Sequence, residues 1–273
     1  MMQITNTHNL PQSLFDAICT VNAKYDKGEA DLSVTQLIDS ARISQLRKQH
    51  QEDIIEDASD MLWRFFGSLA HETIANMDDF GVLKEERLYT KLEGKVISGS
   101  PDLFDGEKVV DYKITSIYKV KNGVDISWER QTNIYRYLLV DHKWDPLELE
   151  IVAILRDAHA DDEKVAVLPV KMWSLKNTEE YIRQRIQSHI QAETTLPLCS
   201  EEERWHSPRK FAVMKTGNKR ALKLFDIKIE ANLYMKQVQE KEKKAIYIEE
   251  RPGEDKRCKL YCNVYNFCDQ AKL

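Results

Sequence analysis

The sequence predicts an α/β fold, in which a mixed β-sheet is flanked by helices and followed by a smaller C-terminal module. Apolar residues between 53 and 77 recur at helical spacing, and from residue 86 the pattern changes to short runs typical of strands. The order helix, three strands, helix, strand implies a mixed sheet with helices packed on it. With 273 residues, 42% of them hydrophobic, the chain is long enough to bury a sizeable core.

The first domain is expected to span residues 1–196. Its helices are predicted from apolar periodicity at residues 11–27, 53–77, 128–141 and 178–193. The second of these is expected to be long and well buried. Strands are predicted between turn-forming glycines and acidic residues, at 86–90, 95–98, 108–115, 147–155 and 164–170.

The second domain is expected to span residues 197–273. Runs at 211–215 and 220–225 alternate around a Gly-Asn turn and predict a hairpin, which a charged helix follows up to about residue 244. This hairpin region concentrates positive charge in Arg209, Lys210, Lys215, Lys219, Arg220 and Lys223. With Trp205 and Phe211 nearby, it could hold a DNA backbone and stack a base. An ordinary solvated hairpin is the alternative reading.

Bulk properties constrain the compartment and the partners. No apolar run approaches the roughly 18 residues that a membrane span requires, and the N-terminus lacks the pattern of a secretory signal. We therefore expect a cytoplasmic protein with no membrane partner. The formal net charge of −5 means that a nucleic-acid-binding chain must gather its positive charge on one face.

Two carboxylates and a lysine are the most informative feature of the chain. Asp111 and Lys113 lie two apart in the strand predicted at 108–115, so they share one face. Asp102 follows the strand predicted at 95–98 and can reach the same point if the two strands form a hairpin. Converging carboxylates repel unless a cation lies between them, and oxygen ligands of this kind suit Mg²⁺. Asp-x-Lys is also common on solvated strand faces, so this pattern alone is only suggestive.

Four motifs in order strengthen the case. Gly67 and His71 form GxxxH, Gly99 and Asp102 form GxxD, Asp111 and Lys113 form DxK, and Gln131 and Tyr135 form QxxxY. This series resembles the RecB-like nucleases of the PD-(D/E)XK superfamily, most of all their phage exonuclease branch. The resemblance covers roughly residues 60–170.

The resemblance implies a restriction-endonuclease-like core and a set of roles. The metal, Mg²⁺ or Mn²⁺, would be held by His71, Asp102, Asp111 and the backbone carbonyl of Tyr112. Lys113 would orient the attacking water, while Gln131 and Tyr135 would orient Lys113 or contact the DNA backbone. From residues alone, Gly67 is expected to permit close packing of its helix on the sheet. Glu86 is a weaker candidate for an outer acid.

The C-terminal cysteines suggest a second metal centre. Cys258, Cys262 and Cys268 form C-x3-C-x5-C, and clustered cysteines in a reducing compartment more often bind metal than form disulfides. The arrangement is similar to the iron–sulfur module of AddB-type nucleases, although its first gap holds one extra residue. We expect a [4Fe–4S] cluster, with Zn²⁺ as the alternative. Cys199 is favoured over Cys19 as the fourth ligand.

The sequence therefore predicts a Mg²⁺-dependent deoxyribonuclease, acting as an exonuclease in phage replication or recombination. DNA is the expected substrate, and a recombination or single-strand-annealing protein is a candidate partner. Two rival readings are an end-processing nuclease subunit of a recombination or CRISPR-like assembly and a catalytically silent DNA-binding scaffold.

Overall fold

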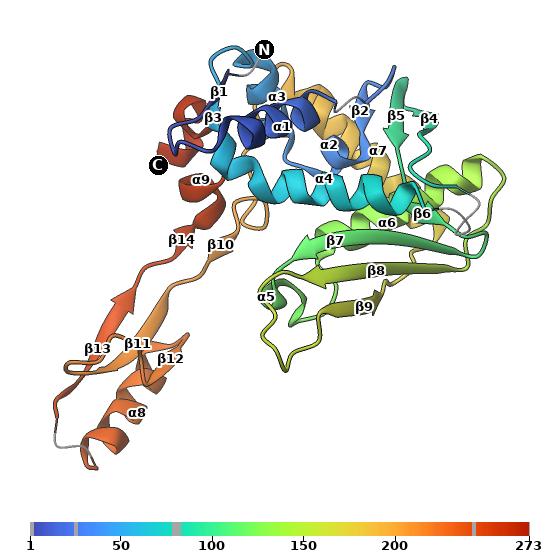
Figure 1. Cartoon of the computed structure of the whole chain (residues 1–273). Coiled ribbons are helices and arrows are strands. Elements are labelled where there is room, and N and C mark those ends of the chain that lie inside the picture. The colour runs from blue at the N-terminus through green and yellow to red at the C-terminus, as the bar shows by residue number, and fades with distance from the viewer. Residues whose placement is uncertain (1–2, 25–26, 78–82, 242–243, 273) are drawn as a thin grey trace. The chain divides into compact units, whose positions relative to one another are not determined.

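The protein folds into two compact units. Figure 1 shows the computed structural model, which describes residues 3–24, 27–77, 83–241 and 244–272. The units are Met1–Pro197 and Leu198–Leu273, and their division lies beside the boundary at residue 196 expected from the sequence. Among the described helices, none is long and apolar enough to cross a membrane.

The first unit has the mixed α/β architecture that the sequence predicted. Its largest sheet has the order β6-β7-β8-β9. The four strands are β6 (Leu103–Phe104), β7 (Lys108–Thr115), β8 (Glu148–Leu155) and β9 (Val165–Pro169). β7 and β8 run parallel, while the two outer pairs are antiparallel. Parallel neighbours need a crossover, which helix α6 (Ile126–Asp141) supplies.

A second sheet of three strands carries the segment that leads to Asp102. Its order is β2-β5-β4, with β2 (Leu32–Ser33), β5 (Lys95–Gly99) and β4 (Leu88–Leu92). The hairpin expected between the strands at 95–98 and 108–115 is therefore wrong, because β5 pairs with β4 and β2 instead. The strand that forms a hairpin with β7 is the two-residue β6, which directly follows Asp102.

Helices pack around these sheets. α1 (Gln12–Ala23), α6 and α7 (Leu175–Ala192) match three predicted helices. The predicted helix at 53–77 is partly wrong, because β3 (Ile55–Asp57) and a 3₁₀ turn (Ala58–Met61) precede α4 (Leu62–Ala75). β3 pairs with β1 (Gln3–Thr5). The short helices α2 (Val34–Ile38), α3 (Ala41–Gln49) and α5 (Ile117–Val120) were not predicted.

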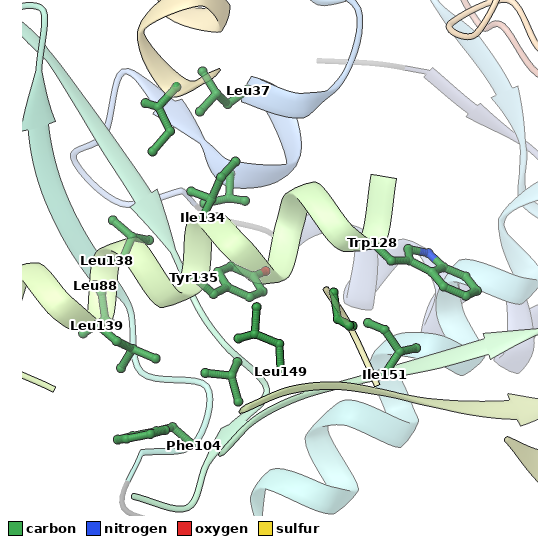
Figure 2. Close-up of a cluster of buried hydrophobic side chains, with 14 of the residues drawn as sticks. Leu37, Leu88, Phe104, Trp128, Ile134, Tyr135, Leu138, Leu139, Leu149 and Ile151 are labelled. Atoms are coloured by element: carbon green, nitrogen blue, oxygen red, sulfur yellow. The ribbon is translucent and has the colours of Figure 1, made fainter. Parts of the chain in front are cut away.

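The main core lies between α6 and the four-stranded sheet. Figure 2 shows Ile134, Tyr135, Leu138 and Leu139 of α6 in one cluster with Leu149 and Ile151 of β8. Strand residues alternate between this core and the opposite face, so every second residue of β8 is buried. The same alternation in β7 points Val109 and Asp111 towards the core side. Asp111 therefore occupies a position at which the alternation predicts an apolar residue.

The second unit contains more sheet than the sequence indicated. β11 (Lys210–Lys215) and β12 (Lys223–Phe225) form the predicted hairpin, and α8 (Lys228–Gln239) is the predicted charged helix. β11 also pairs along its whole length with β13 (Ile246–Arg251), which was not predicted. The unit is completed by strands β10 (His206–Ser207) and β14 (Glu254–Asp255) and helix α9 (Lys256–Leu260).

Candidate active site

A pocket of about 670 Å³ in the first unit collects the side chains of all four motifs. Its walls come from helices α4 and α6, from the end of β5 and from strand β7. Six residues singled out from the sequence line it: His71, Asp102, Asp111, Lys113, Gln131 and Tyr135. Residues separated by more than sixty positions in the chain thus meet at one place.

The hairpin β6–β7 sets the position of Asp102. Leu103 pairs with Val110, so Asp102 lies next to Asp111 on the neighbouring strand. Asp102 is buried, and its Oδ2 accepts a 2.6 Å hydrogen bond from the backbone N–H of Tyr112. This bond fixes the orientation of the carboxylate towards the pocket.

His71 projects from α4 towards that carboxylate. Its Nδ1 lies 3.0 Å from Asp102 Oδ1 and 3.4 Å from Glu85 Oε1. The hydrogen bond to Asp102, and then the one to Glu85, raise the pKa of His71 to about 10. In the absence of a metal ion, His71 is therefore an imidazolium held between two carboxylates.

Asp111 and Lys113 share one face of β7, as the two-residue period of a strand requires. Lys113 Nζ lies 2.6 Å from Asp111 Oδ2. Asp111 is only 1% exposed, and its burial raises the pKa of the carboxyl group above the ordinary value. Within the described part of the chain, neither of its oxygens accepts a hydrogen bond of good geometry, and the Lys113 ammonium group is a counter-charge close to Oδ2. A buried carboxylate without hydrogen bonds is costly unless a further cation satisfies it.

Gln131 and Tyr135 lie one turn apart on α6. Gln131 Nε2 donates a 2.8 Å hydrogen bond to the hydroxyl oxygen of Tyr135. Tyr135 is 5% exposed, and burial raises its pKa well above the ordinary value, so the hydroxyl group stays protonated. Its proton is therefore available to donate into the pocket.

The two motif glycines have different structural roles. A Cβ atom on Gly99 would come within 2.7 Å of Leu138 Cδ1 and of Val34 Cγ2, and within 2.9 Å of Tyr135 Cε1. Gly99 thus lets α6 approach β5 and places Tyr135 in the pocket wall. The close-packing role expected for Gly67 is wrong, since a Cβ there would meet nothing within 4 Å. Gly67 instead lines the pocket and leaves open space in it.

Glu85 is a site residue that was not expected from the sequence. Its carboxylate faces His71, and the ligand atoms of His71, Glu85 and Asp102 all lie within 4.8 Å of one another. Glu85 has a positive φ of 50°, and its N–H donates to the carbonyl of Pro101. The preceding bridge between Leu83 and Phe104 attaches this segment to β6. The neighbouring Glu86 was the acidic residue expected here, and no local pattern in the sequence distinguishes the two.

Two arginines add positive charge to the pocket. Arg64 of α4 and Arg87, just before β4, line it together with Lys113. Arg87 Nη1 donates a 3.2 Å hydrogen bond to Ser98 Oγ, and Arg64 Nη2 lies 3.3 Å from Glu56 Oε2. Neither arginine was singled out from the sequence, because both became neighbours of the carboxylates only on folding.

Four cysteines belong to the second unit, and all are free thiols. The pKa of Cys258 is raised by burial and then by the nearby Cys262, with smaller effects of Asp255 and Cys268, so the C-terminal trio is clustered. Cys199 is tied to the same region: Gln270 Oε1 accepts its N–H at 2.7 Å, and Gln270 Nε2 donates to its carbonyl at 2.9 Å. Cys19, the other candidate for fourth ligand, lies on α1 in the first unit.

The basic residues of the C-terminal hairpin are partly engaged by acids. Arg209 Nη1 lies 3.1 Å from Glu250 Oε1, and Lys210 pairs with Asp226. Lys223 lies over the rings of Phe225 and Tyr234. Lys215 ends β11, while Lys219 and Arg220 lie exposed in the turn that follows it.

The stacking role expected for Phe211 is wrong. Phe211 is buried in a core with Val213, Ala231 and Ile246, because α8 packs on the sheet that β11 and β13 form. Trp205 packs beside the ring of Tyr261, with the two ring centroids 5.2 Å apart.

Comparisons with known proteins add a distant likeness in three dimensions. No protein-family model matches the sequence, and the search of curated proteins found no match. The fold is similar to the crystal structure of a protein named SSO0001, at 17% identity and a TM-score of 0.46, over 64% of this chain and 84% of that one. It is also similar to a protein named "Putative exonuclease" from Eubacterium rectale, at 13% identity and a TM-score of 0.34, over 66% and 74% of the two chains. At these TM-scores, the function has to be argued from the site itself.

Proposed function

We propose that this chain is a divalent-metal-dependent deoxyribonuclease of the PD-(D/E)XK type, which hydrolyses phosphodiester bonds in DNA. One observation carries the proposal. Asp102, just before β6, and Asp111 of β7 meet His71 and Lys113 in a single pocket, and the buried Asp111 lacks hydrogen-bond partners of good geometry among the described residues. Two separate ion pairs, Lys113 with Asp111 and His71 with Asp102, would not need to meet in one pocket, and their convergence on the buried Asp111 points to a shared cation.

The donor set fits a divalent cation. Asp102, Asp111 and His71, with the Tyr112 carbonyl that the family resemblance implies, would hold Mg²⁺ or Mn²⁺, and Glu85 is close enough to join them. When bound, the ion would supply electrostatic activation of a phosphate group and a lower pKa for a water molecule. His71 would lose its proton on ligating the ion, as metal binding to a protonated imidazole requires.

The chain's own residues would do the remaining work. The Lys113 ammonium group lies 2.6 Å from Asp111 and can donate to an attacking water while offsetting negative charge that develops on the phosphate. Tyr135, held by Gln131, has a proton to donate to a phosphate oxygen. Arg64 and Arg87 line the same pocket and can bind phosphates that do not react.

We further propose that the enzyme is an exonuclease of phage replication or recombination, because its motifs most resemble that branch of the superfamily. The second unit would contribute a [4Fe–4S] cluster, or alternatively Zn²⁺, held by Cys199, Cys258, Cys262 and Cys268. The hairpin residues Lys219 and Arg220 would add DNA contacts. A cytoplasmic location suits free, metal-binding thiols.

Hydrolysis of linear and covalently closed circular DNA in Mg²⁺, followed on gels, tests this function. Wild-type protein should degrade linear DNA only, and chelation of the metal should stop the reaction. D111N and K113A should each lose activity by at least about 100-fold, the scale for loss of a transition-state contact. Circular dichroism should show that both variants remain folded. Cleavage of circles would mean an endonuclease, and full activity in D111N would overturn the site assignment.

A further inference from the structure

An exposed aromatic surface lies on α4, the helix that carries His71. Trp63 is 54% exposed and Phe66 is 44% exposed, although large aromatic side chains on an amphipathic helix usually face the core. The two ring centroids are 6.0 Å apart. The expectation of a well-buried helix here is wrong on this side, so the exposed aromatic pair needs a physical reason.

Arg156 covers one face of this surface. Its guanidinium carbon lies 4.1 Å from the centroid of the Trp63 ring, a close cation–π contact. Arg156 follows β8, and its N–H donates to the carbonyl of Thr115 at the end of β7. Among the described residues, no ion pair between Arg156 and a carboxylate is found.

Two elements connect this surface to the candidate active site. Along α4, Trp63, Gly67 and His71 follow one another at intervals of four, so they lie in one row, and Trp63 is about 12 Å from His71 at 1.5 Å per residue. Along the sheet, Lys113 pairs with Ala153, and Arg156 lies three residues further, about 10 Å at 3.3 Å per residue. These two spacings are similar, and the cation–π contact shows that Trp63 and Arg156 meet.

The helix surface between Trp63 and His71 is open at Gly67. Gly67 lies midway between Trp63 and His71, lines the pocket, and has open space where a side chain would project. At the 3.4 Å rise of a stacked strand, about 12 Å corresponds to three or four nucleotides. A polyanion leaving Lys113 would therefore reach an unpaired guanidinium and an exposed indole ring at the end of the row.

We propose that Trp63 and Phe66 stack the bases of a single-stranded DNA segment, while Arg156 binds its phosphates, three or four nucleotides from the bond that is cut. Aromatic stacking with a neighbouring cation binds single strands regardless of sequence, because every base has a flat face. The inference rests on the proposed nuclease function and specifies its substrate: a strand that is unpaired at this distance from the reactive phosphate.

An abasic scan tests the stacking without cleavage. The probe is fluorescein-labelled oligo-dT of twelve nucleotides, with each base removed in turn, bound to full-length D111N and followed by fluorescence anisotropy. One or two abasic positions should weaken binding roughly tenfold, the scale of one stacked base. D111N/W63L should bind the intact strand about tenfold more weakly than D111N does, and removal of a base at the sensitive positions should not weaken its binding further. D111N/W63F should show the same abasic pattern as D111N. Phe retains a ring for stacking, and Leu retains only apolar bulk.

Salt dependence tests the role of Arg156. The slope of log affinity against log salt should fall by about 0.7 in D111N/R156Q, as expected for one lost phosphate contact to a single strand, and by little in D111N/R156K. The proposal would be overturned if D111N/W63L and D111N/W63F bound every probe with equal affinity. So would a change of oligomeric state in W63L, measured by size exclusion, since that face would then join copies of the chain.

The failures are distinguishable. If wild-type protein cleaves DNA and D111N shows no abasic-sensitive position, the stacking site is wrong and the nuclease stands. If D111N shows the scan pattern and wild-type protein cleaves no DNA, the strand-binding surface stands and the nuclease is wrong.

Discussion

His71 Nδ1 and Asp102 Oδ1 lie 3.0 Å apart, and this contact joins helix α4 to hairpin β6–β7. Glu85 approaches the same ring from another segment at 3.4 Å. Both carboxylates stabilise the imidazolium, so a metal ion must displace a proton to bind His71.

Removal of Glu85 should shift the pH dependence of metal binding. Glu85 is the second largest cause of the raised pKa of His71, so E85Q lowers that pKa while leaving the contact with Asp102. In isothermal titrations with Mn²⁺ between pH 6.5 and 9.5, the affinity of the wild type should rise with pH. The curve of E85Q should level off at lower pH. E86Q is the matched control and should follow the wild type. If the affinity curves of E85Q and wild type superimposed, Glu85 would have no part in metal binding at this site.

The stability of the metal-free protein should fall at alkaline pH. The folded state raises the pKa of His71 from 6.5 to about 10, so its stabilising effect is complete below pH 6.5 and is lost as the pH rises towards 10. Each pKa unit corresponds to about 1.4 kcal/mol at most, and solvent screening reduces this for a partly exposed ring. Urea unfolding in a chelator should give a wild-type loss on the order of 1 kcal/mol between pH 6.5 and 9.5, relative to H71Q. If the free energy of unfolding changed equally with pH in the wild type and in H71Q, the charged state of His71 would be contradicted.

Alanine at the two motif glycines should have opposite effects on stability. G99A would place a methyl group against Leu138, Val34 and Tyr135, and overpacking of this kind costs about 1–3 kcal/mol. G67A meets nothing, and alanine in a helix is favoured over glycine by about 0.5–1 kcal/mol. Thermal denaturation should show a lower Tm for G99A and an equal or higher Tm for G67A. Because the new methyl group would enter the pocket, G67A should still lose nuclease activity; full activity would mean that the open space there is not used.

The parts of the site that the sequence predicted are those set by local periodicity or by a motif. A two-residue period was enough to place Asp111 and Lys113 on one face of β7. The motifs placed His71, Gln131 and Tyr135. Asp102 was predicted correctly as a neighbour of Asp111 but through the wrong hairpin, because β6 is only two residues long and leaves no alternating pattern.

The missed features depend on contacts distant in the sequence. Glu85 reaches His71 only because the bridge from Leu83 to Phe104 attaches its segment to β6. Phe211 was expected to stack a base because it lies beside the basic residues of the hairpin, and the strand β13, whose sequence is Ile-Tyr-Ile-Glu-Glu-Arg, was not predicted. Once β13 pairs with β11 and α8 packs on the resulting sheet, Phe211 becomes core. Pairing partners of this kind carry no local signal in the sequence.

The identity of the fourth cysteine ligand can be tested by two matched substitutions. Gln270 holds Cys199 by both backbone groups, two residues beyond Cys268, whereas Cys19 lies on α1 in the other unit. If the C-terminal trio binds metal with Cys199, C199S should lose most of the bound iron or zinc, and C19S should keep wild-type content. Q270A should loosen Cys199 without removing a ligand and give an intermediate metal content.

The metal content is measured on anaerobically purified protein, by analysis of iron, sulfide and zinc and by the absorbance near 400 nm. An iron–sulfur cluster predicts the absorbance band together with iron and sulfide, and zinc predicts stoichiometric metal without the band. Equal metal content in C199S and wild type, with loss in C19S, would reverse the assignment.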